Sequence, residues 1–211
     1  MYLPEHFEEP DIAVLHELIR ARPLCTLVTL SSNGLDANHI PLHLSPEPAP
    51  FGTLQGHVSR ANPILNGSDQ AALAIFHGPE TYVTPSWYPT KTGKVVPTWN
   101  YVVVHAHGRL RFVEDRAWLR AHLEAFTARN EAAFPEPWQL MDAPAEFTDK
   151  LIGAIVGLEF SITRLTGKWK TSQNQPEENR EGVVRGLREC GTSDALQMAD
   201  LVEATCKRRD N

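Results

Sequence analysis

The stretch from position 56 to 63, Gly-His-Val-Ser-Arg-Ala-Asn-Pro, combines residues that suit an anion. Ser59 offers a hydroxyl donor, and the Arg60 guanidinium can clamp a phosphate with two charge-assisted hydrogen bonds. The stretch is predicted to join a strand to a short helix at 60–66, where backbone N–H groups point towards a bound anion. Ordinary capping is the alternative, in which Ser59 starts the helix and Arg60 is solvated.

A second stretch gathers aromatic rings on both sides of a polar loop. Trp87 and Tyr88 precede the loop at 91–94, and Trp99 and Asn100 follow it. Planar rings can enclose a planar ligand, and an asparagine amide both donates and accepts hydrogen bonds. Core packing is the alternative, because Trp and Tyr dominate buried contacts. Such a density of aromatic residues also suits a subunit interface.

The third stretch, 167–176, again runs from a predicted strand into a predicted helix. Lys168 and Lys170 alternate and therefore share one face of the strand. Polar side chains follow at Thr171, Ser172, Gln173 and Asn174. This pattern is typical of an anion site. It is equally compatible with a capping box, in which Asn174 is the cap and Glu177 lies three residues later.

Other chemistry is poorly supported by the sequence. His105 and His107 share a strand face and could chelate a metal, but no third ligand follows at a suitable spacing, so no metal site is predicted. Gly-x-Gly-x-x-Gly, the P-loop pattern and the Gly-x-Ser-x-Gly elbow are all missing from the sequence. This argues against a Rossmann domain, a P-loop NTPase and an α/β-hydrolase.

The elements that must position these stretches are mostly strands. Hydrophobic patterning predicts strands at 24–30, 35–44, 52–58, 70–77, 81–84, 98–113 and 156–169. Helices are predicted at 11–21, 114–128, 145–152, 176–189 and 193–207. Asn33-Gly34 predicts the turn of a hairpin between the first two strands. Short strands with inserted helices favour a mainly β fold, a barrel with helical additions, over alternating βαβ units.

Composition narrows the class further. The formal net charge of −6 argues against DNA binding through the phosphates, although a local basic patch would still permit it. The C-terminal cluster at 207–209 is interpreted as a solvated tail. Three cysteines without Cys-x-x-Cys spacing indicate reduced thiols, as in the cytoplasm. The acidic first ten residues do not resemble a signal peptide, and no apolar run is long enough to cross a membrane.

Five stretches, taken together and in order, resemble the PaiB family of FMN-binding negative transcriptional regulators. They lie at 1–7, 57–63, 82–88, 97–101 and 168–174. The resemblance spans residues 1–190, which we interpret as one FMN-binding split-barrel domain. Residues 191–211 are interpreted as a C-terminal helical extension. The resemblance implies a split β-barrel like that of pyridoxamine-phosphate oxidases and flavin reductases, and a homodimer with FMN at its interface.

The resemblance also implies which residues hold FMN. The candidates are His57, Ser59, Arg60, Asn62, Trp87, Trp99, Asn100, Lys170, Ser172, Gln173 and Asn174. Ala61 departs from the pattern, because many relatives have a lysine at that position of the phosphate segment. Lys170 is the candidate replacement for the missing cation.

Two functions follow from this interpretation, and a third is weaker. The first is a flavin-binding regulator or sensor. The second is a flavin-dependent oxidoreductase, in which FMN supplies the redox chemistry and no obligate protein acid or base is expected. The third is a haem-handling or degenerate barrel that has lost FMN.

Overall fold

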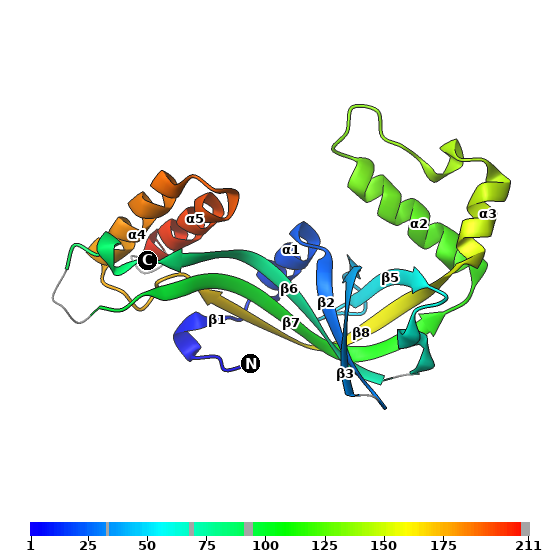
Figure 1. Ribbon diagram of the computed structural model, residues 1–211, viewed down its shortest axis with the longest axis horizontal. Helices are drawn as coiled ribbons and strands as arrows, with labels where there is room; N and C mark the ends of the chain where they lie inside the picture. Colours follow the sequence, from blue (N-terminus) through cyan, green and yellow to red (C-terminus); the bar gives the residue numbers. More distant parts are fainter. Residues whose placement is uncertain (33, 68–69, 91–94, 208–211) are drawn as a thin grey trace. The chain divides into compact units, whose positions relative to one another are not determined.

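The computed structural model describes residues 1–32, 34–67, 70–90 and 95–207 (Figure 1). The strands are β1 (Glu8–Glu9), β2 (Leu24–Ser31), β3 (Gly34–Pro41), β4 (His43–Ser45), β5 (Thr53–Ser59), β6 (Gln70–Val83), β7 (Thr98–Val113) and β8 (Ile155–Lys170). The α-helices are α1 (Ile12–Ala21), α2 (Arg116–Glu131), α3 (Ala145–Gly153), α4 (Glu177–Cys190) and α5 (Ser193–Lys207). Short 3-10 turns are η1 (Glu5–Phe7), η2 (Pro63–Asn66), η3 (Pro85–Trp87) and η4 (Leu140–Asp142).

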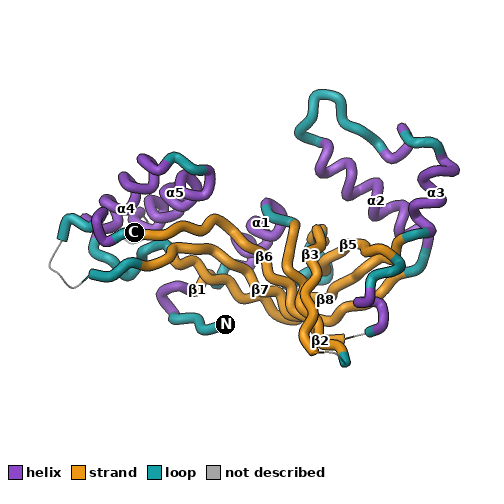
Figure 2. The backbone as a smooth tube through the Cα atoms, viewed as in Figure 1, coloured by secondary structure: helices purple, strands orange, loops and turns teal. Residues whose placement is uncertain are grey.

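Strands dominate the fold, and Figure 2 shows helices attached to them. Within the described residues the strands form one eight-stranded sheet in the order β3-β2-β6-β7-β8-β5-β4, with β1 paired to β8. The pairs β2–β3, β2–β6 and β5–β8 are antiparallel, for example with Gly56 opposite Leu158. The mainly β fold with added helices is therefore confirmed.

Most of the predicted elements are confirmed, with two corrections among the strands. The strands predicted at 70–77 and 81–84 are one strand, β6, which passes through Gly78 and Pro79 without a turn. The strand predicted at 35–44 is interrupted at Leu42, whose backbone N–H donates to the carbonyl of Pro23 at 2.9 Å. The predictions at Asn33, at 91–94 and at 208–209 lie outside the described residues.

The chain divides into two compact units. Unit 1 comprises residues 1–18, 77–104 and 166–211, and unit 2 comprises residues 19–76 and 105–165. The boundaries between the units fall within α1, β6, β7 and β8, so this helix and each long strand contribute residues to both units. None of the described helices is both long enough and apolar enough to cross a membrane.

The core of unit 1 joins α4 and α5 to the ends of β6 and β7. Its buried residues are Val83, Tyr88, Val102, Val183, Leu187, Ala195, Met198, Ala199 and Val202. Trp87 packs against this core, and α4 approaches it closely because it carries Gly182 and Gly186. A Cβ on Gly186 would lie 2.2 Å from Cε2 of Trp87. This packing fixes the stretch from η3 to Tyr88.

In unit 2, helix α2 packs on β8 through one tryptophan. Asp115 caps α2 by accepting a 2.7 Å hydrogen bond from the backbone N–H of Trp118. The Trp118 ring covers Gly157, where a Cβ would lie 2.3 Å from Cζ3 of the indole. Trp118 Nε1 also donates to Glu159 Oε1 at 3.2 Å. These contacts hold α2 on β8, the neighbour of β5, and β5 carries the first residues of the predicted phosphate segment.

Candidate functional site

A pocket of about 220 Å³ lies in unit 1, where the start of β7 meets the end of β8. Its lining residues are Tyr88, Val95, Val96, Thr98, Asn100, Lys170, Ser172, Asn174 and Gln175. Four of the eleven predicted cofactor residues are therefore brought together here. They are Asn100, Lys170, Ser172 and Asn174. The lining combines apolar side chains with a cation, hydroxyls and amides, so the pocket suits a flat ligand with a polar edge.

Asn100 is the most buried polar residue of this pocket, with 1% of its surface exposed. Its Nδ2 donates a 2.9 Å hydrogen bond to Ser172 Oγ. Its Oδ1 is buried without a hydrogen-bond partner among the described residues. A buried acceptor that is left unsatisfied costs about 1–3 kcal/mol. The pocket is therefore suited to a ligand that donates a hydrogen bond to Asn100.

Lys170 places an ammonium group in the same pocket. Its Nζ donates to Thr98 Oγ1 and to the backbone carbonyl of Trp99. Burial, and secondarily the charge of Lys168, lowers the pKa of Lys170 from its ordinary value. An ammonium has three donors, so this geometry leaves one for a ligand acceptor.

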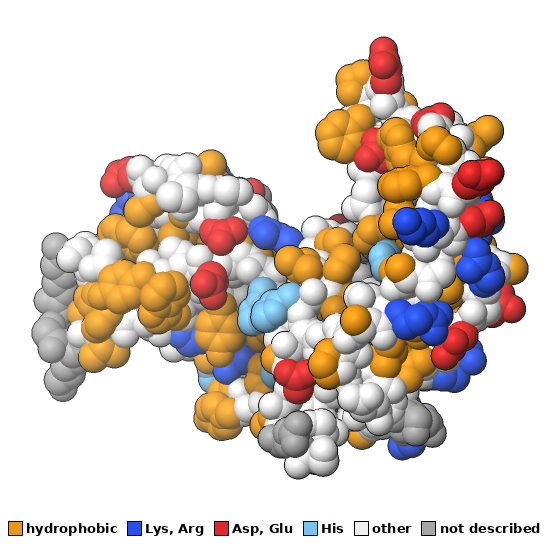
Figure 3. Space-filling model, turned by 45° about the vertical axis from the view of Figure 1, so that its right-hand side comes forward, with side chains coloured by type: hydrophobic (Ala, Val, Ile, Leu, Met, Phe, Trp, Pro, Cys, Tyr) orange, Lys and Arg blue, Asp and Glu red, His pale blue; other side chains and the backbone are white. Residues whose placement is uncertain are grey.

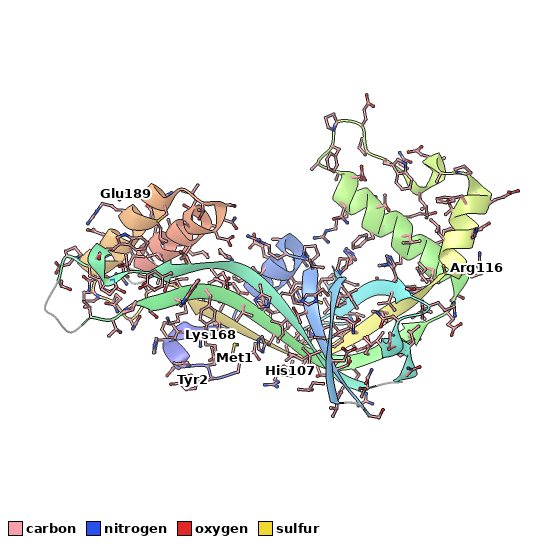
Figure 4. The ribbon with its side chains drawn as sticks, viewed as in Figure 1. Met1, Tyr2, His107, Arg116, Lys168 and Glu189 are labelled. Atoms are coloured by element: carbon pink, nitrogen blue, oxygen red, sulfur yellow. The ribbon has the colours of Figure 1, made fainter. Side chains whose placement is uncertain are left out.

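Lys168, by contrast, makes its contacts with other residues of unit 1. It is buried, and its Nζ donates to the carbonyl of Tyr2 at 3.1 Å. Figure 4 shows Lys168 beside Tyr2, whose ring centroid lies 5.7 Å from Nζ. The ring of Tyr101 lies 5.3 Å from the same atom. The two lysines of the third stretch therefore have different environments, and only Lys170 lines the pocket.

Gln173 and Asn174 also have different environments. Gln173 Oε1 accepts a 2.7 Å hydrogen bond from the N–H of Thr171, and its Nε2 donates to the carbonyl of Trp169. Gln173 thereby holds the turn that shapes the pocket wall. The capping box predicted at Asn174 is wrong, because α4 begins after Pro176 without a side-chain cap. Asn174 instead lines the pocket.

The two tryptophans predicted to hold the cofactor, Trp87 and Trp99, lie outside the lining of this pocket, whereas Tyr88 of the same stretch lines it. Trp87 is packed against Gly186 of α4, as the core-packing alternative expects. Trp99 is 54% exposed and forms an edge-to-face pair with Tyr82, with ring centroids 6.0 Å apart. Sequence reasoning did not list Thr98 or Gln175, which line the pocket. Thr98 lies two residues before Asn100, on the same face of a strand, and Gln175 directly follows Asn174; these positions were the available signal.

The predicted phosphate segment lies in unit 2 and is already hydrogen-bonded within itself. The helix predicted at 60–66 is wrong: only η2 forms, and its cap is Asn62 rather than Ser59. Asn62 Oδ1 accepts from the N–H of Ile64 at 2.9 Å, and its Nδ2 donates to Asn38 at 3.0 Å. Ser59 Oγ accepts from the N–H of Ala61. Phosphate binding here would have to use the Ser59 hydroxyl proton and Arg60.

Arg60 already donates hydrogen bonds to neighbouring groups. Its Nε and Nη2 donate to the carbonyls of Gly153 and Ile155, and its Nη1 pairs with Glu114 at 3.1 Å. Its side chain is 45% exposed, and both terminal nitrogens carry a second N–H. The guanidinium is therefore held in a fixed position and can still donate to an anion.

His57 of β5 faces α2. Its Nδ1 lies 3.2 Å from Nε2 of His122, and the His122 ring stacks on Trp118 with centroids 5.2 Å apart. Burial lowers the pKa of His57. Burial, with the nearby His57 and His43, lowers the pKa of His122 to about 4. A lowered pKa favours the neutral form of each ring, in which one nitrogen of the pair can donate and the other accept.

A larger pocket of about 570 Å³ lies in unit 2 between β2, β3 and η2. Its lining includes Asp36 but no lysine or arginine. That charge does not suit a phosphate ligand. His105 and His107 have ring centroids 6.4 Å apart, and the described residues contain no group of three metal-ligating side chains.

Comparisons with known proteins define the class first. The FAD and heme binding protein from Mycobacterium smegmatis superposes with a TM-score of 0.61 at 17% identity, covering 85% of this chain and 80% of that chain. This likeness shows the fold, a flavin-binding split barrel. The family model described as "Putative FMN-binding domain" matches residues 1–164, and the chain belongs to that family.

Two curated relatives extend along the whole chain. An uncharacterized protein of Emericella nidulans is 34% identical over 250 residues, covering 100% of this chain and 99% of the relative. The "Protease synthase and sporulation protein PAI 2" of Bacillus subtilis is 27% identical over 213 residues, covering 99% of this chain and 100% of the relative. The resemblance to the PaiB family is confirmed, and FMN is the cofactor.

The residues present fit FMN. The ring of FMN has a polar edge on which one N–H lies between two carbonyls. The unit 1 pocket offers a buried unsatisfied acceptor on Asn100, a hydroxyl on Ser172 and an ammonium on Lys170. The donor and acceptor types are complementary to that edge. Arg60 in unit 2 offers the kind of donor that a phosphate needs.

Proposed function

We propose that this protein is an FMN-dependent regulator that works as a homodimer, with the polar edge of the flavin ring held in the unit 1 pocket. The observation that carries the proposal is the unsatisfied Oδ1 of Asn100 beside Lys170 and Ser172. Asn100 accepts from the ring N–H, while Ser172 and Lys170 donate to the ring carbonyls. When bound, FMN supplies reversible redox chemistry.

The same observation argues against placing the phosphate in this pocket. A phosphate dianion only accepts hydrogen bonds, so the buried Oδ1 of Asn100 would face another acceptor and repel it. The hypothesis that Lys170 replaces the missing lysine at Ala61 is thereby modified: Lys170 contacts the ring. Within unit 2, Ser59 and Arg60 stay the candidate phosphate ligands, because the two terminal nitrogens of Arg60 each keep a second N–H.

Riboflavin separates the two assignments, because it has the flavin ring but no phosphate. Lys170→Ala should weaken FMN and riboflavin equally, by about tenfold, the loss expected for one charged hydrogen bond. Arg60→Ala should weaken FMN and leave riboflavin unchanged. Lys150→Ala, at an exposed lysine of α3, is the matched control and should change neither affinity. If Lys170→Ala weakened FMN alone, the ring assignment would be wrong.

The homodimer is supported by the exposed aromatic pair of unit 1. Tyr82 and Trp99 remain 47% and 54% exposed, and large aromatic residues are enriched at subunit interfaces. Trp99→Ala should shift the sedimentation of the protein from dimer to monomer. Trp138→Ala, at a tryptophan of unit 2 that is 44% exposed, is the control and should leave the dimer intact. A monomeric parent protein would refute the dimer.

The regulatory role is supported by the full-length likeness to PAI 2, whose name assigns it to protease synthesis and sporulation. The alternative is a flavin-dependent oxidoreductase. FMN-loaded protein that shifts a specific operator fragment without oxidising NAD(P)H would support the regulator. Sustained NAD(P)H oxidation without a specific shift would support the enzyme. A reducing compartment such as the cytoplasm is part of the proposal, supported by the free thiols of Cys25 and Cys190.

A further inference from the structure

An exposed apolar surface lies on the helical arm of unit 2, which we define as residues 116–153 with α2, η4 and α3. Large hydrophobic side chains on it are solvent-exposed at Phe134, Trp138, Met141, Phe147 and Leu151. Met141 is 82% exposed and Phe134 58%. Soluble proteins rarely leave such side chains clustered in water without a binding partner.

The arm carries two hollows beside these side chains. One, of about 270 Å³, has Trp138 and Met141 on one wall and Thr127 and Ala128 of α2 on the other. The second, of about 450 Å³, is lined by Glu131, Phe134, Pro135 and Glu136. The connection between the helices is anchored, since Glu131 Oε2 accepts a 3.0 Å hydrogen bond from the N–H of Trp138. The hollows are therefore built into a defined backbone.

The connection between α2 and α3 carries charge of one sign, whereas the helices themselves also carry Arg116, Arg120, Arg129 and Lys150. Residues 131–149 contain Glu131, Glu136, Asp142, Glu146 and Asp149, and no lysine, arginine or histidine. Asp149 is neutralised by Arg116 and Arg120. Glu124, Glu131 and Glu136 line the two hollows. In Figure 3 the upper right lobe, which is this arm, shows hydrophobic side chains interspersed with acidic ones.

We propose that the helical arm is a docking surface for a basic amphipathic helix of a partner protein. The apolar face of such a helix would cover Phe134, Trp138 and Met141, and its lysines or arginines would pair with the glutamates at the hollows. Charge selects this occupant, because an acidic surface repels nucleic acid and anionic membranes. A second copy of the arm would oppose carboxylates to carboxylates. The inference does not depend on bound FMN.

The first test uses synthetic peptides of ~18 residues, long enough for about five helical turns. One has a Leu/Trp face and a Lys face, the second replaces every Lys with Glu, and the third scrambles the first. Labelled peptides are titrated into the full chain and followed by fluorescence anisotropy. The basic amphipathic peptide should bind at least tenfold more tightly than either control, and its affinity should fall with added salt. Equal binding of the basic and acidic peptides would overturn the proposal.

The second test changes the surface itself. The double variant Phe134→Ser and Met141→Ser should weaken the basic peptide at least tenfold, and Glu136→Lys should weaken it mainly at low salt. Leu24→Ser, at an exposed apolar residue of β2 that lines neither hollow nor the cofactor pocket, is the matched control. Because both serine positions are exposed, the melting temperature should not change. Unchanged affinity in the double variant, or a change in its oligomeric state that reveals a second copy on the arm, would overturn the proposal.

Discussion

Asn100 Nδ2 donates a 2.9 Å hydrogen bond to Ser172 Oγ, and Ser172 holds a left-handed backbone with φ of 63°. A side chain in this conformation costs roughly 1–2 kcal/mol relative to glycine. Strained residues of this kind persist where the surroundings fix them, and they are concentrated at functional sites. Here the strain directs the hydroxyl towards a buried amide in the proposed cofactor pocket.

Two substitutions at Ser172 distinguish the effect of the strained backbone from the effect of the hydroxyl. Ser172→Ala removes the acceptor of the Asn100 bond and keeps the strain, so it should lower the free energy of unfolding by about 1–2 kcal/mol. Ser172→Gly removes the acceptor and the strain together, and should be about 1 kcal/mol more stable than Ser172→Ala. Both should bind FMN about tenfold more weakly. Urea unfolding and flavin titration measure the two effects, and equal stability of the variants would contradict the strain.

Because Asn100 Oδ1 has no hydrogen-bond partner within the described part of the chain, replacing Asn100 should affect FMN binding much more than stability. Asn100→Leu removes the unsatisfied acceptor but also the donor to Ser172, and because these two effects on stability are opposite, the free energy of unfolding without FMN should change by less than about 1 kcal/mol. The rise in melting temperature on adding FMN should nevertheless disappear, because a ligand stabilises only in proportion to its affinity for the folded state. Thermal unfolding with and without FMN tests this. An undiminished FMN-induced rise would place the flavin elsewhere.

Gly186 of α4 predicts a purely structural effect. A Cβ there would lie within 2.4 Å of three atoms of the Trp87 ring, so Gly186→Ala should lower the free energy of unfolding by about 1–3 kcal/mol. Gly153→Ala is the control, because outside its own helix backbone the nearest atom to an added Cβ is 3.5 Å away, on the flexible Arg116 side chain. Chemical denaturation measures both. Equal stability of the two variants would mean that α4 can move away from Trp87.

Local patterns were sufficient for much of the fold. The boundaries of α5 were predicted at Ser193 and Lys207, because apolar periodicity and a serine start are local signals. The extent of β6 was not predicted, because Gly78-Pro79 resembles a turn when only residues nearby in the sequence are considered. In the structure Gly78 faces Val102 of β7, where a Cβ would lie 2.9 Å from the valine Cβ. That requirement for glycine arises from a residue distant in the sequence.

The candidate site shows the same contrast between what local sequence patterns predict and what contacts distant in the sequence determine. Composition indicated that the stretch at 167–176 is polar, but it could not separate Lys168, buried among aromatic rings, from Lys170, which lines a pocket. The pairing of Asn100 with Ser172 joins residues 72 positions apart. The His57–His122 pair joins residues 65 positions apart, and His122 was not a candidate. Contacts of this kind depend on the register of strands and helices, which no local pattern encodes.

The His57–His122 pair predicts a dependence of stability on pH. The pKa of His122 is lowered to about 4 by burial, His57 and His43, from 6.5 in the unfolded chain. The unfolded state therefore binds more protons between these values. The stabilisation is fully present above pH 6.5 and is lost as the pH falls towards 4. Urea unfolding should show a fall in the free energy of unfolding on the order of 1–2 kcal/mol between pH 6.5 and 5.

His122→Phe should flatten this pH profile. Phenylalanine keeps an aromatic ring against Trp118 and Phe126 but removes the titrating group, so less stability should be lost between pH 6.5 and 5 than in the parent protein. His77→Phe, at an exposed histidine of unit 1, is the matched control and should retain the parent profile. The measurement is urea unfolding of the three proteins across this range. A parent-like slope in His122→Phe would show that other groups, such as His43 beside Arg129, carry the dependence.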